Sequence, residues 1–337
     1  MKDIRLGRTG IVVPQNAFGA LPIQRVTKDE AVALLHRAYD GGMRFFDTAR
    51  AYSDSEEKVG AAFSAMRDKV YISTKTTASD EKHFWDDLHT SLTLLKTDYI
   101  DIYQLHCVPE CYGEEHELYQ AMIKAKEQGK IRHIGITAHK IGVAEDIVRS
   151  GLYETLQFPF SYLASDREIK LARDCAANDI GFIAMKGLSG GLLTNADACM
   201  AFMRDFEVLP IWGIQKQEEL SDWLRFFEED ISMTDEIRDF IRRDRESLLG
   251  EFCRGCGYCM PCTVGITINQ CARMSLMLRR APSHVWLSEH WQNEMMKIGS
   301  CVDCGICKTR CPYELDIPSL IRKNLADYRE ILAGKPV

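Results

Sequence analysis

The sequence predicts a (β/α)8 TIM barrel followed by a small, mostly helical, cysteine-rich domain. Two observations predict this architecture. Between residues 16 and 229, eight strand patterns alternate with eight helix patterns, and such alternation builds a parallel sheet with right-handed crossovers. Nine of the thirteen cysteines lie after residue 252, which marks a second domain. We expect the barrel at residues 1–232, a linking helix at 233–249 and the cysteine-rich domain at 250–337.

The elements of the barrel can be placed in order along the chain. Residues 1–13 predict a hairpin, because two glycines supply a turn between short apolar stretches. The first helix has a full set of boundary signals, with Thr27 as N-cap, Glu30 three residues later and Gly41 at its end. The predicted strands cover 16–22, 43–47, 70–75, 99–106, 131–137, 154–158, 181–186 and 207–212. The predicted helices cover 27–42, 55–66, 81–95, 114–129, 142–151, 166–180, 195–206 and 216–229.

Eight such units favour a closed barrel over an open, doubly wound sheet. An open sheet that binds dinucleotides carries GxGxxG in its first βα turn. The corresponding stretch, FGALPIQR, has no such pattern. Beyond the barrel, a further helix pattern at 233–250 leads to two cysteine runs, a mostly helical stretch between them, and a charged helix at 317–334.

Composition excludes several classes of partner. The chain has 337 residues and a net charge of -7, which favours neither nucleic acid nor an anionic membrane surface. Its apolar runs are shorter than the roughly 20 residues that cross a bilayer. MKDIRLGRTG lacks the apolar core of a secretory signal. We therefore expect a cytoplasmic protein that binds neither nucleic acid nor membrane.

The two cysteine runs predict iron–sulfur chemistry. In a reducing cytosol, cysteines at two-residue spacing are more often metal ligands than disulfides. The second run, CxxCxxCxxxCP, has the spacing of bacterial ferredoxins that bind [4Fe–4S] clusters. Zinc is the alternative because CxxC pairs also bind zinc, but the additional cysteines and the proline favour iron–sulfur. The predicted ligands are Cys253, Cys256, Cys259, Cys262, Cys301, Cys304, Cys307 and Cys311.

Eight thiolates suggest two [4Fe–4S] clusters, with a single cluster as the alternative. By analogy with ferredoxins, the first three cysteines of each run would bind one cluster and the fourth would reach the other. Cys311 would then complete the first cluster and Cys262 the second. Cys271 is a conceivable substitute ligand, although we expect a buried thiol there. The four cysteines before residue 200 have no expected cluster role.

Four polar residues follow the predicted barrel strands. Asp47, Lys75 and His106 close the second, third and fourth strands, and Tyr52 lies five residues beyond Asp47. Each residue alone has a structural explanation, as a cap, a solvated strand end, a core histidine or a rim aromatic. Together they stand at the carboxyl ends of adjacent strands, where barrel enzymes place their active sites.

These four residues suit proton transfer to a carbonyl oxygen. A phenol ordinarily has a pKa near 10, which is high for proton transfer near neutrality. We expect the ammonium of Lys75 to lower the pKa of Tyr52, with Asp47 fixing the ammonium in place. An adjacent imidazole, His106, can orient the substrate oxygen or relay a proton.

The residues around this site resemble the aldo-keto reductase superfamily. LGRTG, FFDTARAYSDSEEKVGAAF, YISTK, YIDIYQLH and IRHIGIT carry the resemblance, which covers roughly residues 3–230. It implies a (β/α)8 barrel that binds NAD(P)H without a Rossmann domain, and a catalytic tetrad of Asp47, Tyr52, Lys75 and His106 with tyrosine as general acid. The motifs CxxCGYCxPC and CxxCGxCxxxCP are similar to those of the iron–sulfur subgroup of this superfamily.

The resemblance also implies residues that bind the nicotinamide. Gln157 matches the carboxamide-binding glutamine of the family. Thr137 and His139 lie where the family commonly has a Ser-Asn pair. Lys186 lies where an aromatic residue often stacks on the nicotinamide.

The phosphate end of the cofactor maps to a separate segment. Gly213 and Lys216 lie where the NADPH enzymes bind phosphate. Glu219 and Trp223 stand in place of family residues there, an arginine and an asparagine. Glu219 would repel a 2′-phosphate, so NAD suits the sequence at least as well as NADP.

The combination of a barrel and clusters leaves several functions open. Nicotinamide transfers two electrons, whereas a [4Fe–4S] cluster normally transfers one, so coupling them usually needs a flavin or a similar group. The clusters could be structural, the barrel could bind a flavin, or the clusters could supply electrons directly to a substrate at the tetrad. The leading prediction is an iron–sulfur oxidoreductase that reduces a carbonyl or oxidises an alcohol.

The alternative is an electron-transfer or redox-partner protein whose barrel no longer binds nicotinamide. The residues at Ala138, Gly213, Glu219 and Trp223 motivate it, because they depart from the cofactor-binding pattern of the family. The expected partners are a small carbonyl or alcohol substrate and an electron carrier such as ferredoxin or flavodoxin.

Overall fold

The computed structural model describes residues 1–248, 252–280 and 283–336. By its internal contacts the chain divides into two compact units. The first comprises Met1–Gly187 and Ala196–Arg238, and the second comprises Leu188–Asn195 and Asp239–Val337. The short segment 188–195, which follows a barrel strand, thus packs with the C-terminal part of the chain.

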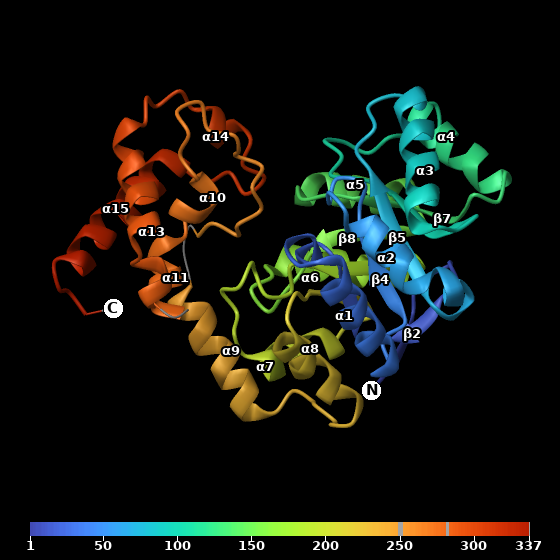
Figure 1. Ribbon diagram of the computed structural model, residues 1–337, viewed down its shortest axis with the longest axis horizontal. Coiled ribbons are helices and arrows are strands. Elements are labelled where there is room, and N and C mark those ends of the chain that lie inside the picture. The colour runs from blue at the N-terminus through green and yellow to red at the C-terminus, as the bar shows by residue number, and fades with distance from the viewer. Residues whose placement is uncertain (249–251, 281–282, 337) are drawn as a thin grey trace. The chain divides into compact units, whose positions relative to one another are not determined.

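The first unit is a closed barrel of eight parallel strands, as the alternating pattern predicts (Figure 1). Each strand pairs with its sequence neighbours, and β10 closes the barrel against β3. The strands are β3 (Ala17–Gly19), β4 (Phe45–Asp47), β5 (Tyr71–Thr76), β6 (Ile100–Leu105), β7 (Ile131–Thr137), β8 (Thr155–Pro159), β9 (Gly181–Met185) and β10 (Val208–Gly213).

Helices follow the strands and cover the outside of the barrel (Figure 1). The first begins at a capping box in which Thr27 and Glu30 bind each other's backbone N–H groups, as the sequence predicts. The helices of this unit are α1 (Lys28–Asp40), α2 (Ser55–Phe63), α3 (Glu81–Leu95), α4 (Glu117–Glu127), α5 (Ile141–Ser150), α6 (Asp166–Ala177), α7 (Ala196–Arg204) and α8 (Gln217–Leu224). Short 3-10 helices are η1 (Pro22–Arg25), η2 (Ser64–Lys69) and η3 (Arg225–Phe227).

An antiparallel hairpin precedes the barrel, formed by β1 (Asp3–Arg5) and β2 (Val12–Pro14). Its apolar side chains belong to one hydrophobic cluster with inward-facing residues of the strands, among them Phe45 and Ile183. Gly7 has a left-handed backbone, and a Cβ there would lie 2.4 Å from the backbone of Asp179 and Gly181. The hairpin therefore needs glycine at this position to approach the barrel.

The second unit is mostly helical and has its own hydrophobic core. The C-terminal helix α15 (Ile317–Leu332) packs on the shorter helices, and the hydroxyl of Tyr328 donates to the carbonyl of Trp286 at 2.7 Å. Buried Asn324 donates to the carbonyl of Cys271 at 2.9 Å. Helix α9 (Asp235–Ser247) begins in the first unit and continues into the second. The other elements of the second unit are α10 (Ile268–Cys271), α11 (Met274–Arg280), α12 (Ser283–Trp286), α13 (Glu289–Met296), η4 (Lys297–Ser300) and α14 (Ile306–Thr309).

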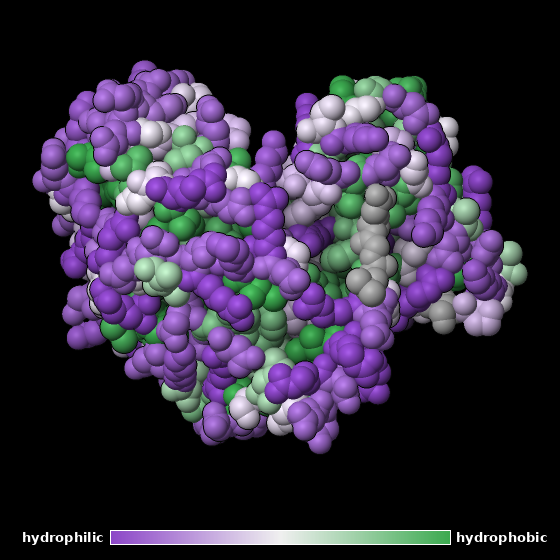
Figure 2. All heavy atoms as spheres, turned by 180° about the vertical axis from the view of Figure 1, so that it is seen from behind, coloured by the Kyte–Doolittle hydropathy of each residue, from purple (hydrophilic) through white to green (hydrophobic). Residues whose placement is uncertain are grey.

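The face of the molecule in Figure 2 is mostly hydrophilic, with hydrophobic side chains in small separate patches. Among the described residues, Val302 is the most exposed large hydrophobic side chain, at 63%. Within the same residues, no helix has both the length and the apolar character to cross a bilayer.

Candidate functional site

The barrel brings the four residues of the predicted tetrad (Asp47, Tyr52, Lys75 and His106) to one end of its strands. Asp47 ends β4, Lys75 is the penultimate residue of β5, and His106 directly follows β6. The parallel register pairs Asp47 with Ser73 and Lys75 with Gln104, so consecutive strands present these side chains side by side.

Lys75 and Asp47 form a buried ion pair. The ammonium Nζ donates to both carboxylate oxygens of Asp47, at 2.8 and 2.7 Å, and to the carbonyl of Thr48 at 2.6 Å. The side chains of the pair are 1% and 3% exposed. Because an ammonium has three hydrogens, these contacts use all of the hydrogen-bonding capacity of Lys75.

Tyr52 and His106 complete the tetrad. The two rings meet edge to face with their centroids 5.9 Å apart, and Lys75 Nζ lies 5.4 Å from the centroid of the Tyr52 ring. Burial lowers the pKa of His106 to about 3, and the Lys75 ammonium acts in the same direction. The imidazole is therefore neutral near pH 7. Its Nδ1 is buried and has no hydrogen-bond partner among the described residues.

The pKa of Tyr52 differs from the sequence-based expectation. Burial raises it above its ordinary value, and Asp47 and Cys107 add to the rise. Our expectation that Lys75 lowers this pKa is wrong for the free chain. The ammonium donates its hydrogens to Asp47 and Thr48, and its position near the ring does not offset the loss of solvation.

A buried carboxylate that the sequence analysis missed supports the loop carrying Tyr52. Glu56, in the first turn of α2, accepts from the hydroxyls of Thr74 at 2.6 Å and Ser91 at 2.7 Å, and it pairs with Arg50. Its side chain is fully buried. Glu56 thereby ties the segment around Tyr52 to β5 and α3. Two adjacent glutamates, Glu56 and Glu57, look equivalent in the sequence, so nothing there indicates that the first is buried.

Gln157 belongs to a hydrogen-bonded network beneath the tetrad. Its Oε1 accepts from Gln104 Nε2 at 2.8 Å, Gln104 also donates to Ser73 Oγ at 2.7 Å, and Gln157 hydrogen-bonds Asp47. Gly135 makes room for this layer, because a Cβ there would lie 2.9 Å from Gln104 Cγ. The amide of Gln157 is therefore already hydrogen-bonded to Gln104 and Asp47 when no cofactor is bound.

Three other predicted cofactor residues lie at the ends of β7 and β9. Thr137 ends β7, and its Oγ1 accepts from the backbone N–H of Cys107 at 2.6 Å. His139 Nδ1 lies 3.8 Å from Cys107 Sγ, and burial lowers the pKa of His139 well below its usual value, with Lys186 acting in the same direction. Cys107 and Lys186 both have left-handed backbones, with φ of 59° and 58°. Such strain in non-glycine residues is concentrated at functional sites.

The carboxylate of Glu219 lies at the start of α8, in the segment that the sequence analysis assigned to the phosphate end of the cofactor. Glu219 Oε2 accepts from the backbone N–H groups of Gln215 at 2.9 Å and Lys216 at 3.2 Å. These are the N–H groups that a helix N-terminus would otherwise offer to a phosphate. Gly213 ends β10. Trp223 is buried, and its ring stacks on that of Trp212 with the ring centroids 3.8 Å apart. These backbone N–H groups are thus already bound by a carboxylate of the protein.

The cysteines of the two runs form two groups in the second unit. Cys253, Cys256, Cys259 and Cys311 influence one another electrostatically. Cys301, Cys304 and Cys307 do the same. We call the first group the inner set, since three of its four thiols are buried, and we call the second group, together with Cys262, the outer set, because Cys304 is exposed and the others are partly buried.

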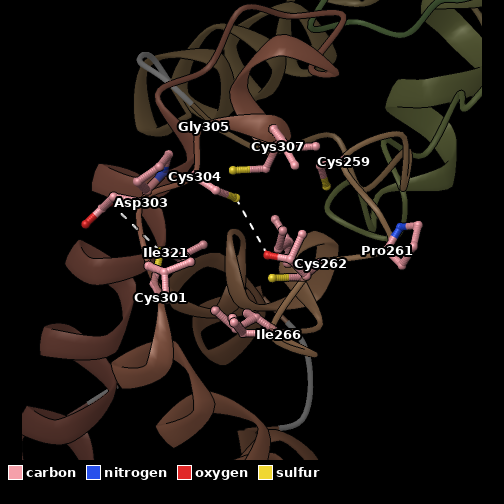
Figure 3. Close-up of a pocket in the computed structure, with 16 residues that line it drawn as sticks. Cys259, Pro261, Cys262, Ile266, Cys301, Asp303, Cys304, Gly305, Cys307 and Ile321 are labelled. Atoms are coloured by element: carbon pink, nitrogen blue, oxygen red, sulfur yellow. Dashed lines mark hydrogen bonds between the residues drawn. The ribbon is translucent and has the colours of Figure 1, made fainter.

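The outer set lines a cavity of about 410 Å³, including its open mouth. In Figure 3 the side chains of Cys262, Cys304 and Cys307 point toward a shared space. Cys301 and Cys259 also line this cavity, and Thr263 contacts Cys304 Sγ at 3.6 Å.

This donor set fits iron–sulfur clusters. None of the thirteen cysteines forms a disulfide. In the described part of the chain, no three Cys, His, Asp or Glu residues converge on a single ion. A four-iron cube has its ligands spread around a larger body, which matches thiols grouped around a cavity.

The remaining cysteines lie outside these sets. Cys271 is fully buried at the end of α10, where its thiol faces the carbonyl of Glu294 at 3.9 Å. Cys175 and Cys199 are buried in the barrel unit, and Cys107 and Cys111 are partly buried there.

The sequence profile described as the Aldo/keto reductase family matches residues 15–207, more than half of the chain. The chain belongs to this family. A second profile, described as a 4Fe-4S dicluster domain, matches residues 252–316. The resemblance inferred from the sequence is thereby confirmed. The chain therefore combines an aldo/keto reductase family domain with a C-terminal dicluster domain, and such a domain implies two clusters.

Similar proteins include reductases and an uncharacterised oxidoreductase. The methylglyoxal reductase DkgA of Salmonella typhimurium is 33% identical over 41% of this chain and 50% of its own length, so the chain spans about half of that relative. The uncharacterized oxidoreductase YqkF of Bacillus subtilis is 27% identical, over 72% of this chain and 83% of its own. An aldo/keto reductase of Klebsiella pneumoniae, solved with NADP and acetate, has a TM-score of 0.60 at 23% identity, covering 72% of this chain and 95% of the other. That likeness shows the fold.

Proposed function

We propose that this aldo/keto reductase protonates a carbonyl substrate at the tetrad while the carbonyl carbon is reduced. The observation that carries the proposal is the convergence of Tyr52, His106 and the Lys75–Asp47 pair at one end of the barrel. Tyr52 would be the general acid, and neutral His106 would orient the substrate oxygen. Lys75 and Asp47 would hold positive and negative charge beside the phenol.

The raised pKa of Tyr52 keeps the phenol protonated, as a general acid in carbonyl reduction requires. In reduction, the phenol gives its proton to an oxygen that develops alkoxide character. An alkoxide is a stronger base than a phenolate, so the transfer stays favourable even from a phenol with a raised pKa. In oxidation, the phenolate would have to form first in a buried site, which burial opposes.

Two sources of electrons are compatible with this proton chemistry. A nicotinamide would have to lack the 2′-phosphate, because Glu219 already occupies the start of α8. We propose NADH or the clusters as the source. We propose the inner and outer sets as the ligands of the two clusters. The closeness of Cys311 to Cys253 and Cys259 supports the assignment of the fourth cysteine of each run to the cluster of the other run.

The outer set also supports a protein partner. Cys304 is exposed, and the apolar side chains of Val302 and Ile306 beside it are exposed as well. A cluster held there would lie near the protein surface, where a one-electron carrier such as ferredoxin or flavodoxin could exchange electrons with it. A small carbonyl compound is the proposed substrate class.

The experiment that tests the proposal is Tyr52→Phe. Turnover of carbonyl compounds should fall by a factor on the order of 10² to 10⁴, as expected when a general acid is lost. Tyr99→Phe, a tyrosine that packs against Arg67 and Arg132 away from the tetrad, is the matched control and should keep its turnover. Unchanged turnover in Tyr52→Phe would remove this residue from the mechanism.

A second candidate function is an electron carrier whose barrel binds no nicotinamide. The internal cap by Glu219 and the engaged amide of Gln157 favour it. Titration of the anaerobic protein with NADH and NADPH separates the two functions. Tight binding of NADH supports the reductase, whereas reduction by ferredoxin with neither nucleotide binding nor carbonyl turnover supports the carrier.

A further inference from the structure

Arg273 is a buried cation in the second unit, between α10 and α11. It is 6% exposed, and its Nε has no hydrogen-bond acceptor among the described residues. No acidic side chain in the described part of the chain pairs with it. The group with which it interacts electrostatically is the thiol of Cys253, in the inner set.

Two glycines make the space for this guanidinium. Gly255 lies between Cys253 and Cys256, and a Cβ there would stand 2.3 Å from Arg273 Nη1. Gly190, in the segment 188–195, leaves room for the same nitrogen, because a Cβ added at residue 190 would lie 2.4 Å from Arg273 Nη1. Both glycines have left-handed backbones, with φ of 67° and 71°. The first cysteine loop is therefore shaped around the arginine.

A buried guanidinium without an anionic partner is costly. Removing a charge from water costs several kcal/mol unless an opposite charge compensates for it. Four thiolates around a [4Fe–4S] cluster carry a net negative charge. The inner set, once loaded, would supply the counter-charge that no carboxylate among the described residues provides.

The outer set has a different electrostatic setting. Arg322 interacts with Cys301, but its side chain is 48% exposed and it pairs with Asp303. Water screens such an exposed charge, and the carboxylate of Asp303 offsets it. The two sets therefore differ in how strongly a fixed positive charge acts on them.

We propose that Arg273 raises the reduction potential of the cluster held by the inner set above that of the cluster held by the outer set. Reduction adds one negative charge to a cluster, and a nearby buried cation stabilises the reduced form. Arg273 would thus act through the cluster, because its charge determines which of the two clusters is reduced more easily. With such a difference in potential, an electron delivered to the outer set by a one-electron carrier protein would move on to the inner set, which Arg273 makes the more favourable acceptor. The inference rests on the proposed cluster ligands.

The test is a redox titration of the full, iron-loaded chain, followed by electron paramagnetic resonance. In Arg273→Gln, one of the two midpoint potentials should become more negative. At a fixed potential the ratio of reduced to oxidised inner cluster should fall about tenfold, which is about 59 mV for a one-electron couple. Arg273→Lys should keep the wild-type potentials. Arg322→Gln is the matched control and should shift neither potential.

Each outcome decides the proposal. If Arg273→Gln lowers one potential by about 59 mV while Arg273→Lys does not, the positive charge sets that potential, which supports the proposal. Equal shifts or equal iron loss in both variants would show that the shape of arginine matters and not its charge. Unchanged potentials in fully loaded Arg273→Gln would overturn the proposal. Wild-type protein with zinc, or with only four irons, would instead refute the proposed ligand sets.

Discussion

Lys75 directs its hydrogen bonds to Asp47 and not to Tyr52. The ammonium binds both carboxylate oxygens of Asp47 at 2.7 to 2.8 Å, while it stays 5.4 Å from the ring of Tyr52. The ion pair acts on the phenol at a distance. Proton donation by Tyr52 therefore depends on the negative charge that develops on the substrate oxygen during reduction.

The buried imidazole of His106 should make stability depend on pH. Its pKa is about 3 in the folded chain and about 6.5 in an unfolded one. A histidine whose pKa is lowered by folding contributes stability that is full above pH 6.5 and is lost as the pH falls toward 3. Each pH unit in that window costs up to about 1.4 kcal/mol.

We expect wild-type protein to lose more stability than His106→Gln when the pH falls from 7 to 5.5. The measurement is the change in the thermal unfolding midpoint between pH 7 and pH 5.5, compared between the two proteins. The contribution of the clusters is common to both proteins and cancels in this comparison. The exposed His290→Gln is the control and should follow the wild type. Parallel behaviour of His106→Gln and wild type would mean that His106 is not held neutral by burial.

Glu219 should control the preference between nicotinamides. Its carboxylate caps the N–H groups of Gln215 and Lys216, in the segment that we propose for the phosphate end of the cofactor. We expect Glu219→Gln to improve NADPH binding relative to NADH by about tenfold, as removal of roughly 1.4 kcal/mol of repulsion would. Isothermal titration of both nucleotides measures the ratio. Glu218→Gln, an exposed neighbour in the same helical turn, should leave it unchanged.

The fourth cysteine of each run should serve the cluster of the other run. Cys311→Ala should remove about four irons and leave the outer cluster, whereas Cys262→Ala should leave the inner one. Cys271→Ala, a buried thiol outside both sets, should keep about eight irons. Iron analysis and electron paramagnetic resonance of anaerobically loaded protein measure this. Full loading of Cys311→Ala would rule out the exchange.

Glu56 should be required for the position of Tyr52. Glu56→Gln removes a charge that accepts from Thr74 and Ser91 and pairs with Arg50. We expect a loss of about 2 kcal/mol in stability, typical of a buried hydrogen bond to a charged group, together with reduced turnover. Glu57→Gln, which breaks an exposed pair with Lys28, should leave the stability nearly unchanged, because water screens that pair. Urea unfolding and carbonyl turnover test both variants, and equal effects would contradict the role given to Glu56.

The sequence predicted the barrel well because its periodicity repeats eight times. Thr27 and Glu30 form the capping box that their spacing indicates, and β4 ends at Asp47 as expected. The pKa of Tyr52 could not be predicted in the same way. It depends on burial and on which acceptors Lys75 reaches, and both are properties of the packed barrel.

Other features escaped sequence reasoning for a similar reason. Glu56 and Arg273 look like ordinary charged residues of helical segments, and nothing in their spacing marks them as buried. Only the surrounding partners show it, such as Thr74 at one site and Gly255 at the other. The predicted domain boundaries stay a prediction.

The segment 188–195 has a consequence for dissecting this chain. It is continuous with strand β9 of the barrel, yet it packs with residues 239–337. A truncation after residue 238 would delete the packing partners of an internal loop and not merely a C-terminal appendage. A recombinant barrel made in that way would carry a loosened connection directly behind Lys186, so kinetic measurements on it would describe an incomplete enzyme.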